Sequence, residues 1–215
     1  MDLINYTSAG VSIRAEQFGP QRGRPVIIAH GSDGITDNLS GPWATTMREF
    51  ADTFALAGYR VLLPYYFDKT GTQPGLPAME SILVNLPAWQ QALADAITFA
   101  GGRPALVGFS LGGHLSLRLR GSASTVVEFF APFLNGLSPA PATPARVQIH
   151  HGESDRLVSI TNAAQIASQL TAEHSTVEVH RYPNAGHGFG GTNPGDAAAL
   201  KQSKTLTVAF VSETK

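Results

Sequence analysis

The chain has 215 residues, of which 43% are hydrophobic and 14% are charged, and this is the composition of a globular protein with one sizeable domain and a substantial core. Its formal net charge is −1 and no block of basic residues occurs, so nucleic acid and anionic membrane surfaces are not expected as partners. Cysteine is absent, which excludes disulfides and thiolate metal sites.

The N-terminal segment, residues 1–6, has neither a basic start nor a long apolar run, so it does not resemble a signal peptide. No stretch of about 18 consecutive apolar residues occurs, so no transmembrane helix is expected. We therefore predict a cytoplasmic protein with no membrane partner.

Strand-like and helix-like segments alternate along the chain. Short apolar runs, of which residues 26–29 (Val-Ile-Ile-Ala) are the clearest, predict strands of a buried parallel sheet. The expected strands are residues 11–18, 26–29, 59–63, 105–107, 125–131, 147–150 and 177–182. Apolar residues at helical spacing predict helices at residues 43–57, 79–100, 115–120, 159–170 and 195–211. Pro87 is expected to break or restart the second of these helices.

The alternation of strands with helices of about 10–15 residues favours βαβ units. We therefore predict an α/β fold with a doubly wound, mostly parallel sheet and helices on both of its faces. No internal repeat, linker or low-complexity tract divides the sequence, so residues 1–215 are expected to form a single domain.

The expected strand at residues 105–107 leads into a Gly-x-Ser-x-Gly pattern centred on Ser110. Between a strand and a helix, this pattern is typical of a nucleophile elbow, a strained turn that holds a serine hydroxyl above the edge of the sheet. Gly108 and Gly112 are expected there because a Cβ at either position would clash where strand and helix pass each other. The same pattern also arises by chance, so the rest of the sequence has to support it.

Two further polar segments follow expected strands. Asp155 comes after the strand at residues 147–150, and His187 comes after the strand at residues 177–182. Because the carboxyl ends of parallel strands meet at one sheet edge, Ser110, Asp155 and His187 are expected to lie together, in the chain order of the α/β-hydrolase triad. In such a site the histidine takes the proton of the serine hydroxyl, and the acid orients the histidine and offsets its charge. The backbone N–H groups of Leu111 and Ser32 are the expected oxyanion donors.

Each of these residues also has an ordinary structural interpretation. Asp155 would serve as a turn residue or as a cap for the helix expected from residue 159, and His187 as a surface histidine in a Gly-rich loop. The joint match of three loops, in order and in position, favours the catalytic interpretation. The other histidines are not spaced as metal ligands, so no metal and no cofactor are expected.

Three segments resemble the dienelactone hydrolase family of α/β-hydrolases. They are residues 108–113 (Gly-Phe-Ser-Leu-Gly-Gly), 151–158 (His-Gly-Glu-Ser-Asp-Arg-Leu-Val) and 182–189 (Tyr-Pro-Asn-Ala-Gly-His-Gly-Phe). The order of strands and helices between them fits as well, so the resemblance covers nearly the whole chain. It implies a compact α/β-hydrolase fold and a hydrolase of esters or lactones, in which Ser110, Asp155 and His187 form the triad.

The sequence departs from the namesake enzymes of this family at two positions. They carry a cysteine at the elbow, where this chain has Ser110, and a glutamate in the loop after the strand at residues 26–29, where this chain has Gly31. No arginine of this chain aligns with the one that binds the carboxylate of their substrate. We therefore expect a serine esterase rather than a hydrolase of dienelactone itself.

A lid would have to lie at residues 133–145, which form a short Pro-rich loop, so no large lid and an open cleft are expected. Small or medium uncharged esters are the expected substrates. Aromatic residues after strand ends are expected to line the substrate pocket, with ordinary packing inside the loops as the alternative; these are Tyr65, Tyr66, Phe67, Phe133 and Phe189.

Two other classes of function are compatible with the same features. An acyl transferase or a peptidase would use the same triad, although peptidase relatives usually carry an additional domain. A non-catalytic ligand-binding protein on a hydrolase fold is expected to have lost a triad residue or the oxyanion loop, and this chain retains both. Hydrolysis of a small-molecule ester or lactone through an acyl-enzyme on Ser110 is therefore the predicted function.

Overall fold

Within residues 1–137, 141 and 143–213, which the computed structural model describes, eight strands form one sheet in the order β1-β2-β4-β3-β5-β6-β7-β8. The strands are β1 (Asp2–Ser8), β2 (Val11–Phe18), β3 (Pro25–Ala29), β4 (Arg60–Pro64), β5 (Ala105–Phe109), β6 (Thr125–Phe129), β7 (Arg146–Gly152) and β8 (Thr176–Tyr182). β2 pairs antiparallel with β1 and with β4. All other neighbours are parallel, which confirms the predicted α/β class with a mostly parallel sheet.

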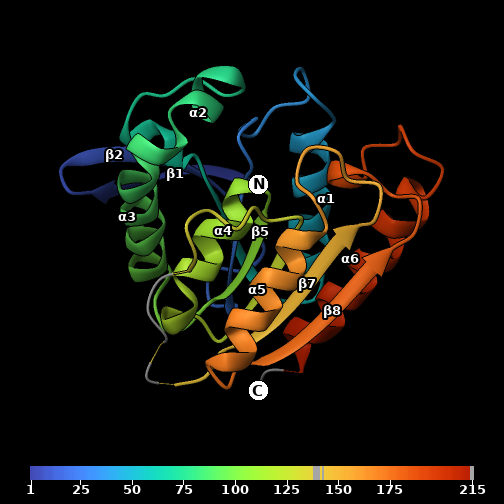
Figure 1. Cartoon of the computed structure of the whole chain (residues 1–215). Coiled ribbons are helices and arrows are strands. Elements are labelled where there is room, and N and C mark those ends of the chain that lie inside the picture. The colour runs from blue at the N-terminus through green and yellow to red at the C-terminus, as the bar shows by residue number, and fades with distance from the viewer. Residues whose placement is uncertain (138–140, 142, 214–215) are drawn as a thin grey trace.

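Helices cover both faces of this sheet (Figure 1). They are α1 (Trp43–Leu56), α2 (Leu76–Glu80), α3 (Ile82–Ala100), α4 (Leu111–Arg118), α5 (Thr161–Ala172) and α6 (Asp196–Ser212). Leu93 of α3, Leu115 of α4 and Ile166 of α5 belong to the apolar core on one face. Phe50 of α1 and Phe210 of α6 belong to the core on the other. In the described ranges, no helix is both long enough and apolar enough to cross a membrane.

The sheet is buried where the chain is most apolar. Every residue of β5 and of β6 is buried, as expected for central strands covered on both faces. The parallel strands all end at one edge of the sheet, so the loops that follow β3, β5, β7 and β8 are brought together there. These are the loops that contain the candidate residues of the sequence.

The break in the long helix lies elsewhere than predicted. α2 ends at Glu80 and α3 begins at Ile82, whereas Pro87 lies inside α3. Pro87 lacks the N–H that would bond the carbonyl of Leu83, and Leu83 is an exposed residue. Water can satisfy that carbonyl, so the helix continues through the proline.

Some elements have other bounds than those expected. β1 is an edge strand in which most residues stay exposed or half-buried, so it lacks the apolar run that predicts a strand. The strand expected to reach residue 131 ends at Phe129, because Phe130 has a φ of 42°. Between β4 and α3 the chain forms a 3-10 turn, Tyr66–Lys69, and the short helix α2, which begins at Leu76, before the helix expected from residue 79. Positions 138–140 and 142 of the expected open loop at 133–145 lie outside the described residues.

Candidate active site

Ser110 lies in the turn between β5 and α4. Its φ is 52° and its ψ is −116°. Residues other than glycine rarely adopt this backbone conformation, which costs about 1–3 kcal/mol. Hydrogen bonds hold the turn on both sides. The N–H of Ser110 donates to the carbonyl of Phe129 over 2.9 Å, and the carbonyl of Ser110 accepts from the N–H of His114 over 3.1 Å. The rest of the fold therefore maintains a strained conformation at this one serine.

The two glycines of the pattern allow the strand and the helix to approach each other. A Cβ at Gly108 would lie 2.3 Å from the carbonyl oxygen of Gly112, and one at Gly112 would lie 2.2 Å from the carbonyl oxygen of Ala29. Both distances are shorter than any real Cβ contact. The expected clash at these positions is confirmed.

Asp155 and His187 are joined across two loops. Nδ1 of His187 lies 2.7 Å from Oδ2 of Asp155. The other oxygen, Oδ1, accepts the backbone N–H groups of Leu157 over 2.9 Å and Val158 over 2.8 Å. Because a carboxylate only accepts hydrogen bonds, Nδ1 of His187 is the protonated nitrogen in the neutral ring, and Nε2 is left with a free lone pair.

The carboxylate of Asp155 is held in its ionised form. Burial by itself raises its pKa, but hydrogen bonds from His151 and His187 and the N–H of Val158 outweigh burial, so the pKa lies well below its usual value. Asp155 also forms a turn with its own backbone, as the structural interpretation of the sequence had it. It does not cap α5, which begins six residues later at Thr161.

Ser110 and His187 line the same cavity, which has a volume of about 240 Å³. Its wall opposite Ser110 is Gly31, where a Cβ would lie 3.3 Å from Cβ of Ser110 and 4.0 Å from its Oγ. The described lining contains one charged side chain, Asp33, together with small polar and apolar residues; the full set is Gly31, Ser32, Asp33, Ser40, Trp43, Met79, Ser110, Leu157 and His187.

The two residues expected to supply oxyanion donors, Ser32 and Leu111, both lie close to Ser110: Ser32 lines the same cavity, and Leu111 follows Ser110 in the chain. Leu111 is the first residue of α4, so its N–H has no acceptor within the helix. Ser32 lines the cavity, and its carbonyl accepts the N–H of Gly75 over 2.9 Å. Tyr66 fixes the start of the same loop, because its hydroxyl donates to the carbonyl of His30 over 2.7 Å.

None of the five aromatic residues expected in the substrate pocket lines this cavity. Tyr65 and Phe67 line a separate cavity of about 190 Å³ beside Arg14 and Asp68. The ring of Tyr66 is fully buried and stacks on His30 with 3.9 Å between ring centroids.

The remaining two aromatic residues pack elsewhere. Phe189 is buried against Phe130 and Tyr182. Phe133 is half-buried, and its backbone N–H donates to Oδ1 of Asn162. These five positions were expected in the pocket because they lie close in sequence to strand ends. In the structure two of them line another cavity, and the other three pack into the core or against another loop.

Three apolar residues take their place in the cavity. Trp43 is the first residue of α1, Met79 lies in α2, and Leu157 follows Asp155. Trp43 approaches His187 edge-on, with 6.3 Å between ring centroids. No sequence pattern identifies these residues, because each reaches the site from a different element.

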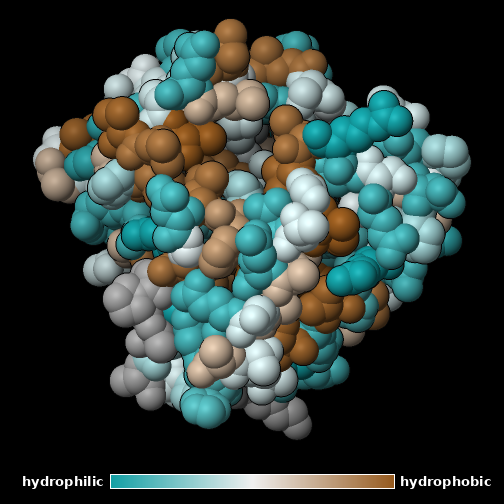
Figure 2. Space-filling model, viewed as in Figure 1, coloured by the Kyte–Doolittle hydropathy of each residue, from teal (hydrophilic) through white to brown (hydrophobic). Residues whose placement is uncertain are grey.

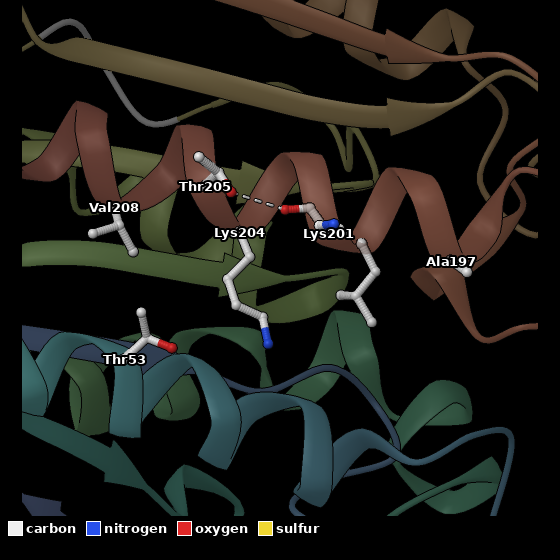
Figure 3. Close-up of a pocket in the computed structure, with 7 residues that line it drawn as sticks. Thr53, Ala197, Lys201, Lys204, Thr205 and Val208 are labelled. Atoms are coloured by element: carbon white, nitrogen blue, oxygen red, sulfur yellow. Dashed lines mark hydrogen bonds between the residues drawn. The ribbon is translucent and has the colours of Figure 1, made fainter.

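A larger cavity of about 510 Å³ lies away from Ser110, between α1 and α6. Figure 3 shows Lys204 extending from α6 towards α1 in this cavity, with Thr53 opposite. Lys204 forms an ion pair with Glu49 over 2.7 Å. This larger cavity contains none of the candidate residues. No group of three or more acidic, histidine or cysteine side chains is arranged for a metal ion in the part of the chain that the structure describes.

Comparison with known proteins gives a family match. Residues 13–214 match the model of the dienelactone hydrolase family. No curated protein sequence matches the chain.

Solved structures of hydrolases share the fold. A dienelactone hydrolase-like promiscuous phosphotriesterase from metagenomic libraries has a TM-score of 0.77 at 20% identity, over 99% of this chain and 97% of that chain. A thermophilic esterase from Thermogutta terrifontis has a TM-score of 0.71 at 16% identity, over 99% and 93%. An α/β hydrolase from a deep-sea metagenome has a TM-score of 0.65 at 16% identity, over 100% and 98%. These similarities show that the chain has the α/β-hydrolase fold.

Proposed function

The chain belongs to the dienelactone hydrolase family, and on that premise we propose that it is a serine hydrolase that cleaves carboxylic esters or lactones through an acyl-enzyme on Ser110. One observation carries this proposal. Ser110 and His187 line one cavity, and Nδ1 of His187 is hydrogen-bonded to Asp155 over 2.7 Å. This arrangement leaves Nε2 of His187 free to act as a base towards a hydroxyl in the cavity.

In the first half of the reaction, Oγ of Ser110 attacks the ester carbonyl carbon while Nε2 of His187 takes its proton. The carbonyl oxygen becomes an oxyanion, which accepts hydrogen bonds from the backbone N–H groups of Leu111 and Ser32. The carbon–oxygen bond to the alcohol then breaks. His187 returns the proton to the leaving oxygen, and Asp155 offsets the positive charge that the imidazole carries in between.

In the second half, water attacks the acyl-enzyme and His187 acts as the base again. The bond between the acyl carbon and Oγ of Ser110 breaks, Oγ regains its proton and the carboxylic acid leaves. The proposed chemistry needs three side chains and two backbone donors, so it requires no metal or cofactor. The cytoplasmic location and the single-domain organisation stay predictions.

Small or medium uncharged esters are the proposed substrates. The cavity of about 240 Å³ is lined by Trp43, Met79 and Leu157, and the charged side chain in its described lining is the carboxylate of Asp33. Apolar walls favour uncharged groups, and a carboxylate beside the cavity disfavours an anionic substrate. The Thermogutta esterase with the same fold is bound to propionate, which is in keeping with a small acyl group.

The experiment that tests this function is an activity screen of the purified protein. Nitrophenyl esters of increasing acyl length, neutral lactones and nitroanilide amides would be compared, each beside Ser110→Ala. The proposal expects hydrolysis of short and medium esters and loss of that activity in Ser110→Ala. Activity confined to long acyl chains would contradict the substrate class, and amide cleavage or acyl transfer in place of hydrolysis would favour the alternative reactions of the same triad.

A further inference from the structure

Glu128 is a buried carboxyl group that the proposed reaction does not use. It lies in β6 between Val127 and Phe129, and its residue is 0% exposed. Oε2 accepts the backbone N–H of Ala131 over 2.8 Å, whereas Oε1 is buried without a hydrogen-bond partner among the described residues. A buried carboxylate with one unsatisfied oxygen is expensive unless a positive charge is near.

His151 is the neighbouring polar group on the same face of the sheet. Glu128 pairs with Ile149 of β7, and His151 lies two residues further along that strand. Because side chains alternate between faces with a period of two, Glu128 and His151 are diagonal neighbours on one face. His151 is also 0% exposed.

The hydrogen bonds of His151 fix one of its two protons. Nε2 lies 2.8 Å from the carbonyl oxygen of Val158 and 3.4 Å from Oδ2 of Asp155. A carbonyl only accepts, so Nε2 carries a hydrogen in every state of the ring. Nδ1 is buried and has no partner among the described residues, so the charge of His151 depends on whether Nδ1 carries a proton too.

The titratable groups around His151 favour the charged ring. Burial alone lowers its pKa, but the hydrogen bonds to Asp155 and Val158 and the negative charges of Glu128 and Asp155 outweigh burial, so the pKa lies above the usual value. Burial raises the pKa of Glu128 to about 7, against an opposing effect of His151. The ring is therefore flanked by two carboxyl groups, one from β6 and one from the loop after β7.

The other elements packed here supply two more titratable or charged groups from α4 and one from the loop after β8. α4 contributes His114, whose pKa is lowered to about 4 by burial, and Arg118, whose Nε donates to Gln90 of α3. The loop after β8 contributes His187, whose Nδ1 lies 2.7 Å from Oδ2 of Asp155, the same oxygen that His151 approaches. A single proton is thus left to be placed between Glu128 and His151.

We propose that His151 holds this proton on Nδ1 and is a buried imidazolium between the carboxylates of Glu128 and Asp155. It is a positioning residue, because it approaches the same carboxylate oxygen of Asp155 as His187 does. The negative charge of Asp155 therefore stabilises two histidine rings and not His187 alone. The transfer is balanced: Glu128 gives up the proton that His151 takes, and the pair stays neutral overall. With part of the charge of Asp155 engaged by His151, less of that charge is left to stabilise a positive charge on the neighbouring imidazole of His187. The acid limb of the activity profile is therefore expected at lower pH than in a protein without the charged His151.

The test replaces His151 by a side chain that keeps the donor and loses the charge. In His151→Gln, the amide can still donate to the carbonyl of Val158. The acid limb of the kcat/KM profile reports the base of the free enzyme, and we expect it to move to higher pH by about half a unit to one unit. Glu128→Gln should shift it in the same direction, because His151 loses its proton without the second carboxylate.

His150→Gln is the matched control. His150 is the adjacent residue of β7, is equally buried, and points to the opposite face, where it contacts Tyr182 and Gln148. We expect the acid limb of the kcat/KM profile of His150→Gln to lie at the same pH as that of the unchanged protein. Equal shifts in His150→Gln and His151→Gln, or no shift in either His151→Gln or Glu128→Gln, would overturn the proposal.

A second readout needs neither turnover nor a variant. The kinetic test rests on the proposed esterase function, whereas ¹⁵N NMR of the histidine rings reports protonation directly. At pH 7 we expect both nitrogens of His151 to have the shifts of a protonated ring. An unprotonated Nδ1 at that pH overturns the proposal even if ester hydrolysis is found, and a protonated Nδ1 supports it even if the proposed substrates fail.

Discussion

At the scale of single residues, Asp155 uses its two carboxylate oxygens for different purposes. Oδ1 accepts two backbone N–H groups of its own loop, and this fixes the direction of the side chain. Oδ2 is thereby aimed at Nδ1 of His187, 2.7 Å away. The same contacts that make Asp155 an ordinary turn residue place its second oxygen for the proposed reaction.

Asp155→Asn should abolish most of the activity without unfolding the protein. An asparagine amide can donate to Nδ1 of His187, and the ring would then carry its proton on Nε2, where it cannot accept the proton of Ser110. We expect kcat to fall on the order of 10⁴-fold, with an unchanged circular dichroism spectrum. A loss of less than tenfold would mean that the hydrogen bond between Asp155 and His187 does not set the state of the base.

The apolar residues at the cavity should set the preference for the substrate. Leu157 lines the cavity and is 59% exposed, so Leu157→Ser removes apolar contact with a bound acyl chain. We expect the KM for a nitrophenyl butyrate to rise about three- to tenfold, which corresponds to about 1 kcal/mol of lost apolar contact, and the KM for the acetate to change less. Leu56→Ser, at an exposed position of α1 that does not line the cavity, is the control and should leave both values unchanged.

The sequence predicts the candidate residues to the extent that each follows a strand. Ser110, Asp155 and His187 lie in the loops that follow β5, β7 and β8, so a correct order of strands is sufficient to bring them to one edge of the sheet. Trp43 and Met79 enter the cavity from the first turn of α1 and from α2, and their positions depend on how those helices pack. Glu128 is a lone charged residue within the apolar run of β6, and this pattern is the sequence signal of a buried carboxyl group.

At the scale of elements, the close passage of β3, β5 and α4 determines whether the turn at Ser110 can form. Gly112→Ala would place a methyl group 2.2 Å from the carbonyl oxygen of Ala29, and backbone atoms on both sides leave no flexible group to move away. We expect a loss of stability of about 3 kcal/mol or more, measured by urea unfolding, together with loss of activity. Gly190→Ala, which would meet nothing within 4 Å, should unfold at nearly the same urea concentration as the unchanged protein, and equal losses in the two variants would contradict this account.

The central strands were predictable because they are continuous apolar runs, and β3, β5 and β6 illustrate this. The elements that were missed depend on context. β1 is stabilised by its pairing with β2 rather than by burial of an apolar run. The continuation of α3 through Pro87 depends on the exposure of that part of the helix, which the sequence does not reveal.

At the scale of the whole molecule, buried histidines couple stability to pH. Burial lowers the pKa of His30 to about 4 and that of His114 to about 4, and it also lowers the pKa of His150. The folded protein keeps these rings uncharged, whereas the unfolded chain takes up protons as the pH falls through about 6.5. The stabilisation is complete above that pH and is lost progressively towards pH 4.

We therefore expect the free energy of unfolding, measured by urea titration, to fall between pH 7 and pH 4.5. Each of His30 and His114 accounts for a loss on the order of 3 kcal/mol in the free energy of unfolding once the pH has fallen to about 4. Glu128 and His151 act in the opposite sense over part of this range, because their raised pKa values favour the folded state at low pH, but they are two groups against three. In His114→Gln the loss should be smaller. A free energy of unfolding that does not change between pH 7 and pH 4.5 would contradict this interpretation of the buried histidines.

The identity of Ser110 as the nucleophile is the claim on which the rest depends, and covalent labelling by a fluorophosphonate tests it most directly. The account predicts that the intact mass increases by one label, that the label maps to Ser110, and that Ser110→Ala gains none. If the unchanged protein gains no label, or if Ser110→Ala is labelled to the same extent, the serine hydrolase proposed here is contradicted.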